Sequence, residues 1–449
     1  MIEHLLEKYA VGVPRYTSYP TAPHFSETVT ADTYANWLSD LSDPQPISLY
    51  MHIPYCEEMC WYCGCLTKIV KRYAPISSYV DTLTAEIDLV AAHLPGKFKA
   101  GAVHWGGGSP TILKADDWKR TFEILHKRFE FGSDADIAVE MDPRTTTPEY
   151  VAALAECGVN RVSIGVQDFD ENVQKAINRI QPYEVTARVV GWLRDAGITN
   201  INLDLMYGLP HQTVALVEDM TEKALSLAPT RIALFGYAHV PWMKKHQRLI
   251  PTELLPDTLE RYRQSETAAK MLVEAGFNRI GLDHFAAPKD TMTRAAQDGS
   301  LRRNFQGYTT DTSDTMLGFG ASSIGNMPQG YVQNTSAIAN YTRSVSNGEL
   351  PIARGLKVSA EDRLHRDAIN MLMCDLRLDV AALCEQHGVA DSRLDFVFER
   401  LANPLKDGLM TLNGRTIQVT DAGRPLVRVI AAAFDEYLAH AKARHSIAI

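Results

Sequence analysis

Short apolar runs alternate with longer amphipathic stretches along residues 47–284. The apolar runs begin near residues 47, 100, 136, 161, 200 and 231, and another begins near residue 278. Between them lie segments such as SSYVDTLTAEIDLVAAHL and TPEYVAALAECGV, whose apolar residues recur at helical spacing. Alternating strands and helices predict an α/β fold with a parallel sheet and right-handed crossovers, closed into a complete or a partial barrel.

Small or polar residues follow each predicted strand. In a parallel barrel these positions lie at the carboxyl ends of the strands, which form its mouth. We therefore expect one site at this mouth, surrounded by Cys56, Gly107, Glu140, Gln167, Asp204 and His239.

The alternating pattern stops at about residues 345–358. Beyond it, AEDRLHRDAINMLMCDLRLD and VRVIAAAFDEYLAHAKARH predict helices. Between them, Asn413 and Gly414 separate two alternating runs, which is a strong hairpin signal. The sequence thus predicts a barrel domain over residues 46–345 and a mainly helical C-terminal domain with a hairpin over residues 346–449. Helices with a hairpin also resemble a winged helix, which in an acidic chain is more often a lid or packing module than a DNA reader.

Residues 1–45 precede the first predicted strand. Their segment PRYTSYPTAPHF contains prolines that exclude a regular helix. We predict an extended N-terminal arm that crosses the barrel mouth, and a disordered leader is the alternative. Arg15 stands in this segment beside Tyr16 and Tyr19. Such an arm would bring a permanent cation and flat aromatic faces to a ligand at the barrel mouth, so we assign Arg15 a part in catalysis.

Charge and composition narrow the function. The net charge of −9 argues against broad nucleic-acid binding, which needs a basic surface, but it leaves room for an acidic small molecule held by a local group of cations. An apolar fraction of 45% is enough to fill two cores. The first residues lack the apolar run of a signal peptide, and no stretch is long enough to span a bilayer. We therefore predict a cytoplasmic protein without membrane insertion.

Four of the seven cysteines lie in HIPYCEEMCWYCGC, residues 52–65. Cys56, Cys60 and Cys63 have the spacing Cx3Cx2C directly after the first predicted strand, and Cys65 follows them. A structural zinc site normally joins two separated ligand pairs, and no second pair is present. Three thiolates of one loop can instead hold three irons of a [4Fe-4S] cluster and leave the fourth iron open. Zinc and a redox dithiol stay as alternatives.

This spacing resembles that of the radical S-adenosylmethionine (SAM) superfamily, and the glycine-rich GGGSP at residues 106–110 resembles a second motif of that superfamily. Over nearly the whole chain, the sequence is similar to the oxygen-independent coproporphyrinogen III oxidase family. The segments that carry this resemblance are PRYTSYPTA, YMHIPYCEEMCWYCGC, HWGGGSPT, VEMDPR, SIGVQDF, DLMYGLP, YAHVP, DHFA and NFQGYTT. Cys65 and the PRYTSYPTA arm distinguish that family from related heme-binding chaperones, which are the main alternative.

The resemblance implies a partial (β/α)6-type barrel and an activity. The activity is the oxidative decarboxylation, without oxygen, of two propionate side chains of coproporphyrinogen III to vinyl groups. It gives protoporphyrinogen IX and uses 5′-deoxyadenosyl radicals made from SAM. An electron donor such as flavodoxin or ferredoxin is implied, and we expect a monomer.

The resemblance also implies roles for single residues. Cys56, Cys60 and Cys63 would bind the cluster, and Cys65 would lie beside it without binding iron, as a catalytic residue. The residues that match the site of the SAM molecule on the cluster are Tyr50, Gly107, Glu140 and Ile324. Those that match the site of a second SAM molecule are Tyr62, Gly108, Ser109, Gln167, Arg179, Asp204 and Ala238. Small departures from the family pattern occur at Tyr62, Ser109 and Leu66.

Overall fold

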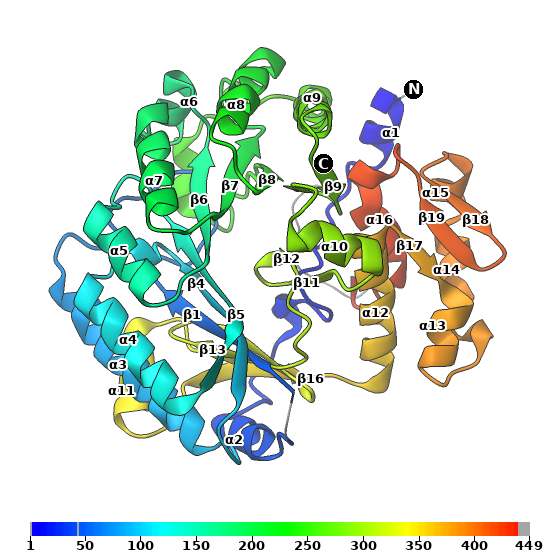
Figure 1. The fold of residues 1–449 in the computed structure, drawn as a ribbon. Coiled ribbons are helices and arrows are strands. Elements are labelled where there is room, and N and C mark those ends of the chain that lie inside the picture. The colour runs from blue at the N-terminus through cyan, green and yellow to red at the C-terminus, as the bar shows by residue number, and fades with distance from the viewer. Residues whose placement is uncertain (1, 43–44, 439–449) are drawn as a thin grey trace.

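A large twisted sheet forms the centre of the molecule in the computed structural model, which describes residues 2–42 and 45–438 (Figure 1). Its central strands are all parallel. In spatial order they are β13 (Met316–Phe319), β1 (Ile47–Ile53), β4 (Lys99–Gly107), β5 (Glu130–Met141), β6 (Arg161–Gln167), β7 (Asn200–Tyr207) and β8 (Arg231–Gly236). The strands predicted near residues 47, 100, 136, 161, 200 and 231 are thus confirmed.

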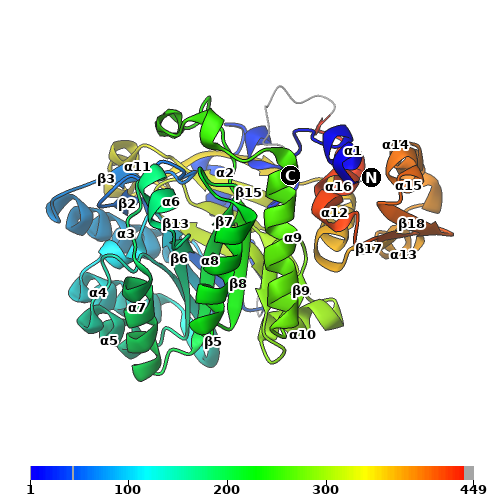
Figure 2. The ribbon, with the colours of Figure 1, turned by 90° about the horizontal axis from the view of Figure 1, so that it is seen from above.

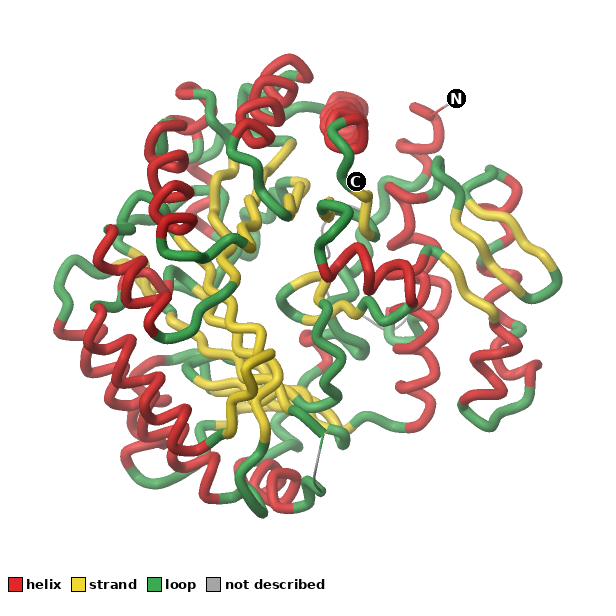
Figure 3. The backbone as a smooth tube through the Cα atoms, in the orientation of Figure 1, coloured by secondary structure: helices red, strands yellow, loops and turns green. Residues whose placement is uncertain are grey.

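Helices connect the successive parallel strands and cover the outer face of the sheet (Figures 1 and 3). They are α3 (Ala74–Ala92), α4 (Ala115–Arg128), α5 (Pro148–Glu156), α6 (Glu171–Ala176), α7 (Tyr183–Asp195), α8 (Val214–Ser226) and α9 (Thr258–Glu274). Strand β1 is buried along nearly its whole length, as expected of a parallel strand with both faces covered. The sheet does not close, because β16 and β9 are its two free ends. The fold is therefore a partial barrel with six β/α units, as predicted.

Antiparallel strands extend this sheet on both sides. Beyond β8 lie β10 (His284–Ala286) and β9 (Asn278–Ile280), and beyond β13 lie β14 (Ile324–Met327), β15 (Gly330–Asn334) and β16 (Ile352–Lys357). Strand β16 follows residue 345, at which the sequence predicts that the barrel domain ends, and it forms the outer edge of the same sheet. The domain limits themselves stay a prediction. The remaining elements here are α10 (Thr291–Asp298), α11 (Ile338–Ser346), β11 (Arg302–Asn304) and β12 (Gly307–Thr309).

The C-terminal part packs helices around a small three-stranded sheet. Its elements are α12 (Ala360–Asp375), β17 (Arg377–Asp379), α13 (Val380–Gln386), α14 (Phe396–Arg400), α15 (Ala402–Lys406), β18 (Met410–Asn413), β19 (Thr416–Val419) and α16 (Val427–Ala431). The predicted hairpin is present, with Asn413 paired to Thr416 and Gly414 in the turn at a φ of 59°. The second predicted helix is broken after residue 434, and its part beyond residue 438 lies outside the described residues.

The N-terminal segment lies between the barrel and the C-terminal helices (Figures 1 and 2). It begins with α1 (Ile2–Lys8) and ends with α2 (Ala31–Ser39), and residues 9–21 between them form no helix. Tyr16 and Tyr19 are only 4% and 2% exposed, in an apolar cluster with C-terminal residues such as Leu364. The expectation that these two aromatic faces meet a substrate is therefore wrong, since burying them against the C-terminal domain removes them from water. Among the described residues, no helix combines the length and the apolar character needed to cross a membrane.

Candidate active site

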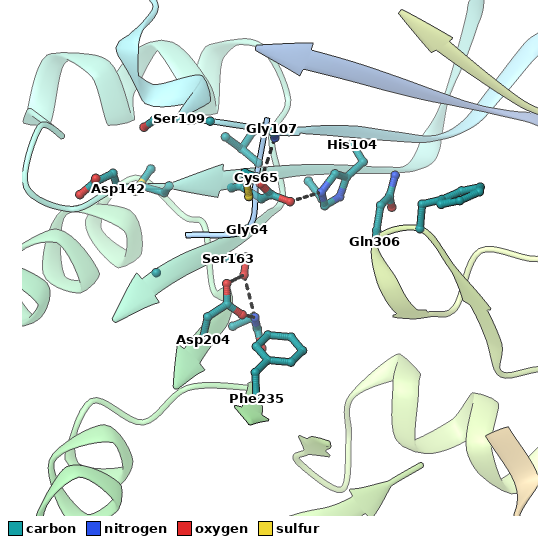
Figure 4. Close-up of a pocket in the computed structure, with 18 of the residues that line it drawn as sticks. Gly64, Cys65, His104, Gly107, Ser109, Asp142, Ser163, Asp204, Phe235 and Gln306 are labelled. Atoms are coloured by element: carbon teal, nitrogen blue, oxygen red, sulfur yellow. Dashed lines mark hydrogen bonds and ion pairs between the residues drawn. The ribbon is translucent and has the colours of Figure 1, made fainter. Parts of the chain in front are cut away.

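A cavity of about 650 Å³ lies inside the partial barrel (Figure 4). It is lined by the cysteine loop, by the carboxyl ends of the strands and by Arg15 of the N-terminal arm. Every residue that the sequence assigns to the cluster, to SAM or to catalysis lines this cavity, apart from Tyr50 and Ile324. Residues from distant parts of the chain thus meet as predicted at one site, and their individual roles stay predictions.

The cysteine loop leaves the sheet at the end of β1 and returns to its own beginning. Strands β2 (Tyr55–Cys56) and β3 (Lys68–Ile69) pair in parallel, with Cys56 opposite Ile69. Inside the loop, the amide of Cys63 donates to the carbonyl of Cys60 at 3.2 Å. The β2–β3 pairing therefore closes the base of the loop, and the bond between Cys63 and Cys60 forms a turn inside it. Together they hold the cysteines at the barrel mouth.

Each of the three candidate ligand sulfurs accepts a hydrogen bond. The Thr67 hydroxyl donates to Cys56 Sγ at 3.2 Å, and the Cys65 amide donates to Cys63 Sγ at 3.3 Å. Two guanidiniums donate to Cys60 Sγ at 3.6 Å each, those of Arg144 and Arg179. Hydrogen bonds and cations around the sulfurs are what ligating thiolates need, so the residues present fit an iron–sulfur cluster.

The protonation of two of these thiols differs. Burial raises the pKa of Cys56 to about 11, whereas a hydrogen bond from the Cys65 thiol, assisted by the Cys65 amide and by the charges of His246 and Lys244, lowers the pKa of Cys63 to about 6. In the described part of the chain, no three His, Cys, Asp or Glu side chains are grouped closely enough to hold one metal ion. A [4Fe-4S] cluster takes one thiolate per iron and so needs wider spacing than a zinc ion does.

The glycine-rich motif packs against the cysteine loop. A side chain on Gly108 would place its Cβ 2.6 Å from the carbonyl oxygen of Tyr55, and Gly107 has a φ of 118°, a conformation that favours glycine. A Cβ on Gly106 would lie 2.8 Å from the carboxylate of Glu140. The sequence predicts that these glycines let the backbone approach a cofactor, and the structure shows that they also let β4 approach the loop and β5.

Glu140 is held at the end of β5 by two donors (Figure 4). The Gly107 amide and His104 Nε2 each donate to its carboxylate at 3.2 Å, and the Glu140 side chain is still 41% exposed. Beside it, the ring of His104 stacks on Tyr50 with 5.9 Å between centroids. Tyr50, which does not line the cavity, thus contacts a residue that does. An oriented carboxylate with free lone pairs can accept hydrogen bonds from an amine or from hydroxyls.

A second polar group lies across the cavity on β6 and β7. Asp204 accepts hydrogen bonds from Ser163 Oγ at 2.9 Å and from Asn202 Nδ2 at 2.7 Å, and burial raises the pKa of Asp204 to about 6 (Figure 4). Gln167 ends β6 with a φ of 69°, an uncommon conformation for a residue with a side chain. This group lies on β6 and β7, whereas the group around Glu140 lies on β4 and β5. The cavity therefore has polar groups on two sides.

Arg179 is committed to the protein itself. Its Nη2 donates to the Gly165 carbonyl at 2.6 Å, and its Nη1 lies 3.4 Å from Asp142. Burial alone would raise the pKa of Asp142, but the charges of Arg179 and Arg144 lower it to about 2. These partners engage both Nη atoms, whereas Nε is buried without a hydrogen-bond partner among the described residues. The assignment of Arg179 to a SAM carboxylate stays a prediction. Ile324 lies on β14 and packs with Phe25 and Tyr331, away from the cavity lining.

Sequence reasoning missed several residues that line the cavity. They include His104, Asp142, Arg144, Phe235, His284 and Gln306. Several of them lie in segments that carry the family resemblance, namely HWGGGSPT, VEMDPR, DHFA and NFQGYTT. These lining residues could therefore have been found by examining the polar residues inside each motif that carries the resemblance. His239, expected at the mouth, instead bonds to Tyr237 and lies outside the cavity lining.

Comparisons with known proteins agree with this site. A family model described as the radical SAM superfamily matches residues 50–224. A relative from Bradyrhizobium diazoefficiens named oxygen-independent coproporphyrinogen III oxidase is 49% identical, with 97% of each chain covered. One of the same name from Salmonella typhimurium is 37% identical over 97% of this chain and 95% of its own.

A solved structure extends the likeness to the fold. Coproporphyrinogen III oxidase from Escherichia coli, described as a radical SAM enzyme, superposes with a TM-score of 0.90 at 35% identity, covering 94% of this chain and 97% of that one. The likeness therefore includes the arm and the C-terminal helices as well as the barrel. The chain belongs to the oxygen-independent coproporphyrinogen III oxidase family of the radical SAM superfamily.

Proposed function

We propose that this protein converts coproporphyrinogen III to protoporphyrinogen IX by oxidative decarboxylation of two propionate side chains, without oxygen. The observation that carries the proposal is that the Cx3Cx2C loop, Cys65 and Arg15 of the arm line one cavity. Family membership implies a [4Fe-4S] cluster and SAM, with Cys56, Cys60 and Cys63 as the residues that would hold the cluster. When bound, these groups supply a 5′-deoxyadenosyl radical that abstracts hydrogen from the propionate β-carbon.

The chain's own residues orient the reactants and exclude water. Glu140, fixed by its two donors, would receive the polar groups of one SAM molecule. The second polar group, with Asp204 and Gln167, supports a second SAM molecule in the same cavity. The raised pKa of Asp204 lets its carboxyl act as either a donor or an acceptor near neutral pH. The number of SAM molecules is part of this proposal.

The arm supplies charge for an acidic substrate. Arg15 is exposed at the cavity, and its Nη2 reaches the Gly236 carbonyl only at 3.4 Å. Arg303 Nε donates to the Arg15 carbonyl at 3.3 Å and its guanidinium lies over the ring of Tyr308. Burial would raise the pKa of Asp283, but His284, Arg303 and Arg15 lower it to about 2. This concentration of cations in an acidic chain fits the carboxylates of a tetracarboxylate.

The test is anaerobic purification with iron and sulfide analysis, followed by incubation with SAM, dithionite and coproporphyrinogen III. We expect protoporphyrinogen IX together with 5′-deoxyadenosine and methionine. Heme binding without 5′-deoxyadenosine would support a heme chaperone instead, and zinc without iron would contradict the cluster. The cytoplasmic location and the monomeric state stay predictions that fractionation and sedimentation can check.

A further inference from the structure

Exposed apolar side chains gather on segments that surround the cysteine loop. The described chain leaves ten large apolar side chains exposed, and six of them lie on the loop or on two segments bonded to it. Leu66 follows Cys65 directly, and Ile180 follows Arg179. The others belong to the long loop between β8 and α9, where Met243 is 64% exposed and Leu249 is 55% exposed. Such a concentration of exposed apolar surface indicates an interaction site.

Both neighbouring segments are fastened to the cysteine loop by hydrogen bonds. On one side, the Trp61 amide donates to the Ile177 carbonyl at 2.9 Å, and Asn178 Nδ2 donates to the Met59 carbonyl at 2.7 Å. The segment that carries Ile180 is therefore held against the loop. Surface residues on it keep a fixed position relative to Cys60.

On the other side, the β8–α9 loop makes three such bonds. Lys244 Nζ donates to the Cys65 carbonyl at 3.2 Å, His246 Nε2 donates to the Cys63 carbonyl at 2.7 Å, and Gln247 Nε2 donates to the Tyr62 carbonyl at 2.9 Å. In Figure 2 this green loop projects beyond the barrel. It is bonded to the carbonyls of the cysteine loop and at the same time leaves Trp242, Met243, Lys245, Arg248 and Leu249 exposed. We call Leu66, Ile180 and these exposed residues of 242–249 the loop face.

The charge of the loop face is opposite to that of the whole protein. Over the chain, 54 acidic residues outnumber 45 basic ones. Residues 239–254 instead carry Lys244, Lys245 and Arg248 against the single acidic Glu253. Lys245 and Arg248 are exposed. In the cysteine loop itself, Glu57 is exposed, and Glu58 lies within 4.0 Å of Lys71 and 3.9 Å of Arg144, which offset part of its charge.

We infer that the loop face is the docking site of a small acidic one-electron carrier protein that bears a flavin or an iron–sulfur centre. The inference rests on the proposed function, because a cluster that starts each reaction needs one electron from outside. The carrier is oxidised by one electron, the cluster is reduced by one, and no bond forms or breaks. A basic patch with apolar side chains steers and then holds an acidic partner, and this face is bonded to the loop that carries the candidate cluster ligands.

Charge reversal on the holoenzyme tests the inference. The probe is reduced flavodoxin, and stopped-flow absorbance follows electron transfer to the cluster, normalised to iron content. The double variant Lys245→Glu/Arg248→Glu should be reduced about tenfold more slowly than wild type at low salt, and the difference should shrink at high salt. Its affinity for flavodoxin, measured by calorimetry, should fall by a similar factor. Reduction by dithionite, which needs no docking, should be unchanged.

A matched control reverses two exposed charges on the C-terminal domain, Arg377→Glu/Lys406→Glu, which alters the net charge equally. This control should behave as wild type. The inference fails if the loop-face variant is reduced by flavodoxin at the wild-type rate, or if the control slows as much. Met243→Ser, which changes no charge, should also weaken flavodoxin binding, and unchanged binding would contradict the apolar part of the face. Turnover of wild type with dithionite tests the proposed function separately.

Discussion

Arg179 donates through Nη1 to Cys60 Sγ at 3.6 Å, across 119 residues of sequence. Arg144 makes an equal contact with the same sulfur, and Asp142 lies against both arginines at 2.7 and 3.4 Å. One candidate cluster ligand is thus enclosed by two fixed cations. The carboxylate of Asp142, which contacts both arginines, keeps its charge because its pKa is lowered to about 2. The positive charge of Arg179 should therefore influence the reduction potential of the cluster.

Arg179→Met should therefore make the cluster harder to reduce. Removing a cationic donor from a thiolate ligand disfavours the more negative reduced state. We expect the reduction potential to fall by roughly 60 mV or more, equivalent to about a tenfold change for a one-electron couple. Redox titration followed by electron paramagnetic resonance measures it. Arg188→Met, on the exposed face of α7, is the control, and equal potentials in both variants would contradict the argument.

Single substitutions in the cysteine loop should distinguish the three cysteines that bind the cluster from Cys65, which lies beside it. Cys56→Ala, Cys60→Ala or Cys63→Ala should abolish the absorption near roughly 410 nm that a thiolate-bound cluster gives. Cys65→Ala should keep it and lose turnover, because Cys65 approaches Cys63 through its own hydrogen bonds and is exposed at the cavity. Iron analysis with visible spectra is the measurement. Equal iron loss in all four variants would place Cys65 among the ligands.

The part played by the arm is best tested by a point substitution. A deletion of residues 1–22 would also remove Tyr16 and Tyr19 from the C-terminal apolar cluster, and so would destabilise the fold itself. Arg15→Gln removes only the cation at the cavity. We expect the cluster and SAM binding to persist, slow uncoupled formation of 5′-deoxyadenosine, and a rise of KM for coproporphyrinogen III by about tenfold, the loss of one charge-assisted contact.

Arg302→Gln is the matched control for Arg15→Gln. It removes a nearby exposed guanidinium that donates to the backbone carbonyls of Gly299 and Leu301. That variant should keep the wild-type KM. A wild-type KM in Arg15→Gln would end the assignment of Arg15 to substrate handling.

Local patterns predicted much of this fold. The six β/α units were visible because each buried parallel strand is a continuous apolar run and each helix has its own period. The strands β13 to β16 were not, since they are short and contain glycine, for example Gly318 and Gly325, and are held by pairing to β1 and to each other. Such pairing is non-local, and no single segment shows it.

The site, like the fold, has parts that local sequence shows and parts that depend on non-local contacts. The ligand loop and the glycine motif could be recognised because their residues are adjacent in sequence. The contact of Arg179 with Cys60 and the inward turn of Tyr16 depend on tertiary packing. The prolines of the arm could indicate an extended segment, but only the packed C-terminal helices decide which of its side chains face the cavity.

A buried carboxyl far from the cysteines predicts a pH dependence of stability. Glu86 on α3 is 1% exposed and accepts hydrogen bonds from Tyr341 Oη at 2.6 Å, the Gly320 amide at 2.7 Å and Asn334 Nδ2 at 2.6 Å. It joins α3 to the end of β13, to β15 and to α11. Burial raises the pKa of Glu86 to about 7, against the three donors that lower it.

Because the folded protein holds the Glu86 proton up to about pH 7 and the unfolded chain releases it near pH 4.5, this group's contribution is complete below about pH 4.5 and is lost as the pH rises to about 7. The loss amounts to roughly 3 kcal/mol of unfolding free energy. Glu86→Gln cannot titrate, so the stability of wild type relative to this variant should fall by that amount between pH 4.5 and 8. Anaerobic urea unfolding at both pH values measures it, with exposed Glu123→Gln as control. A constant difference between wild type and Glu86→Gln would show that Glu86 has the same pKa in the folded and unfolded protein, with its three donors fully offsetting burial.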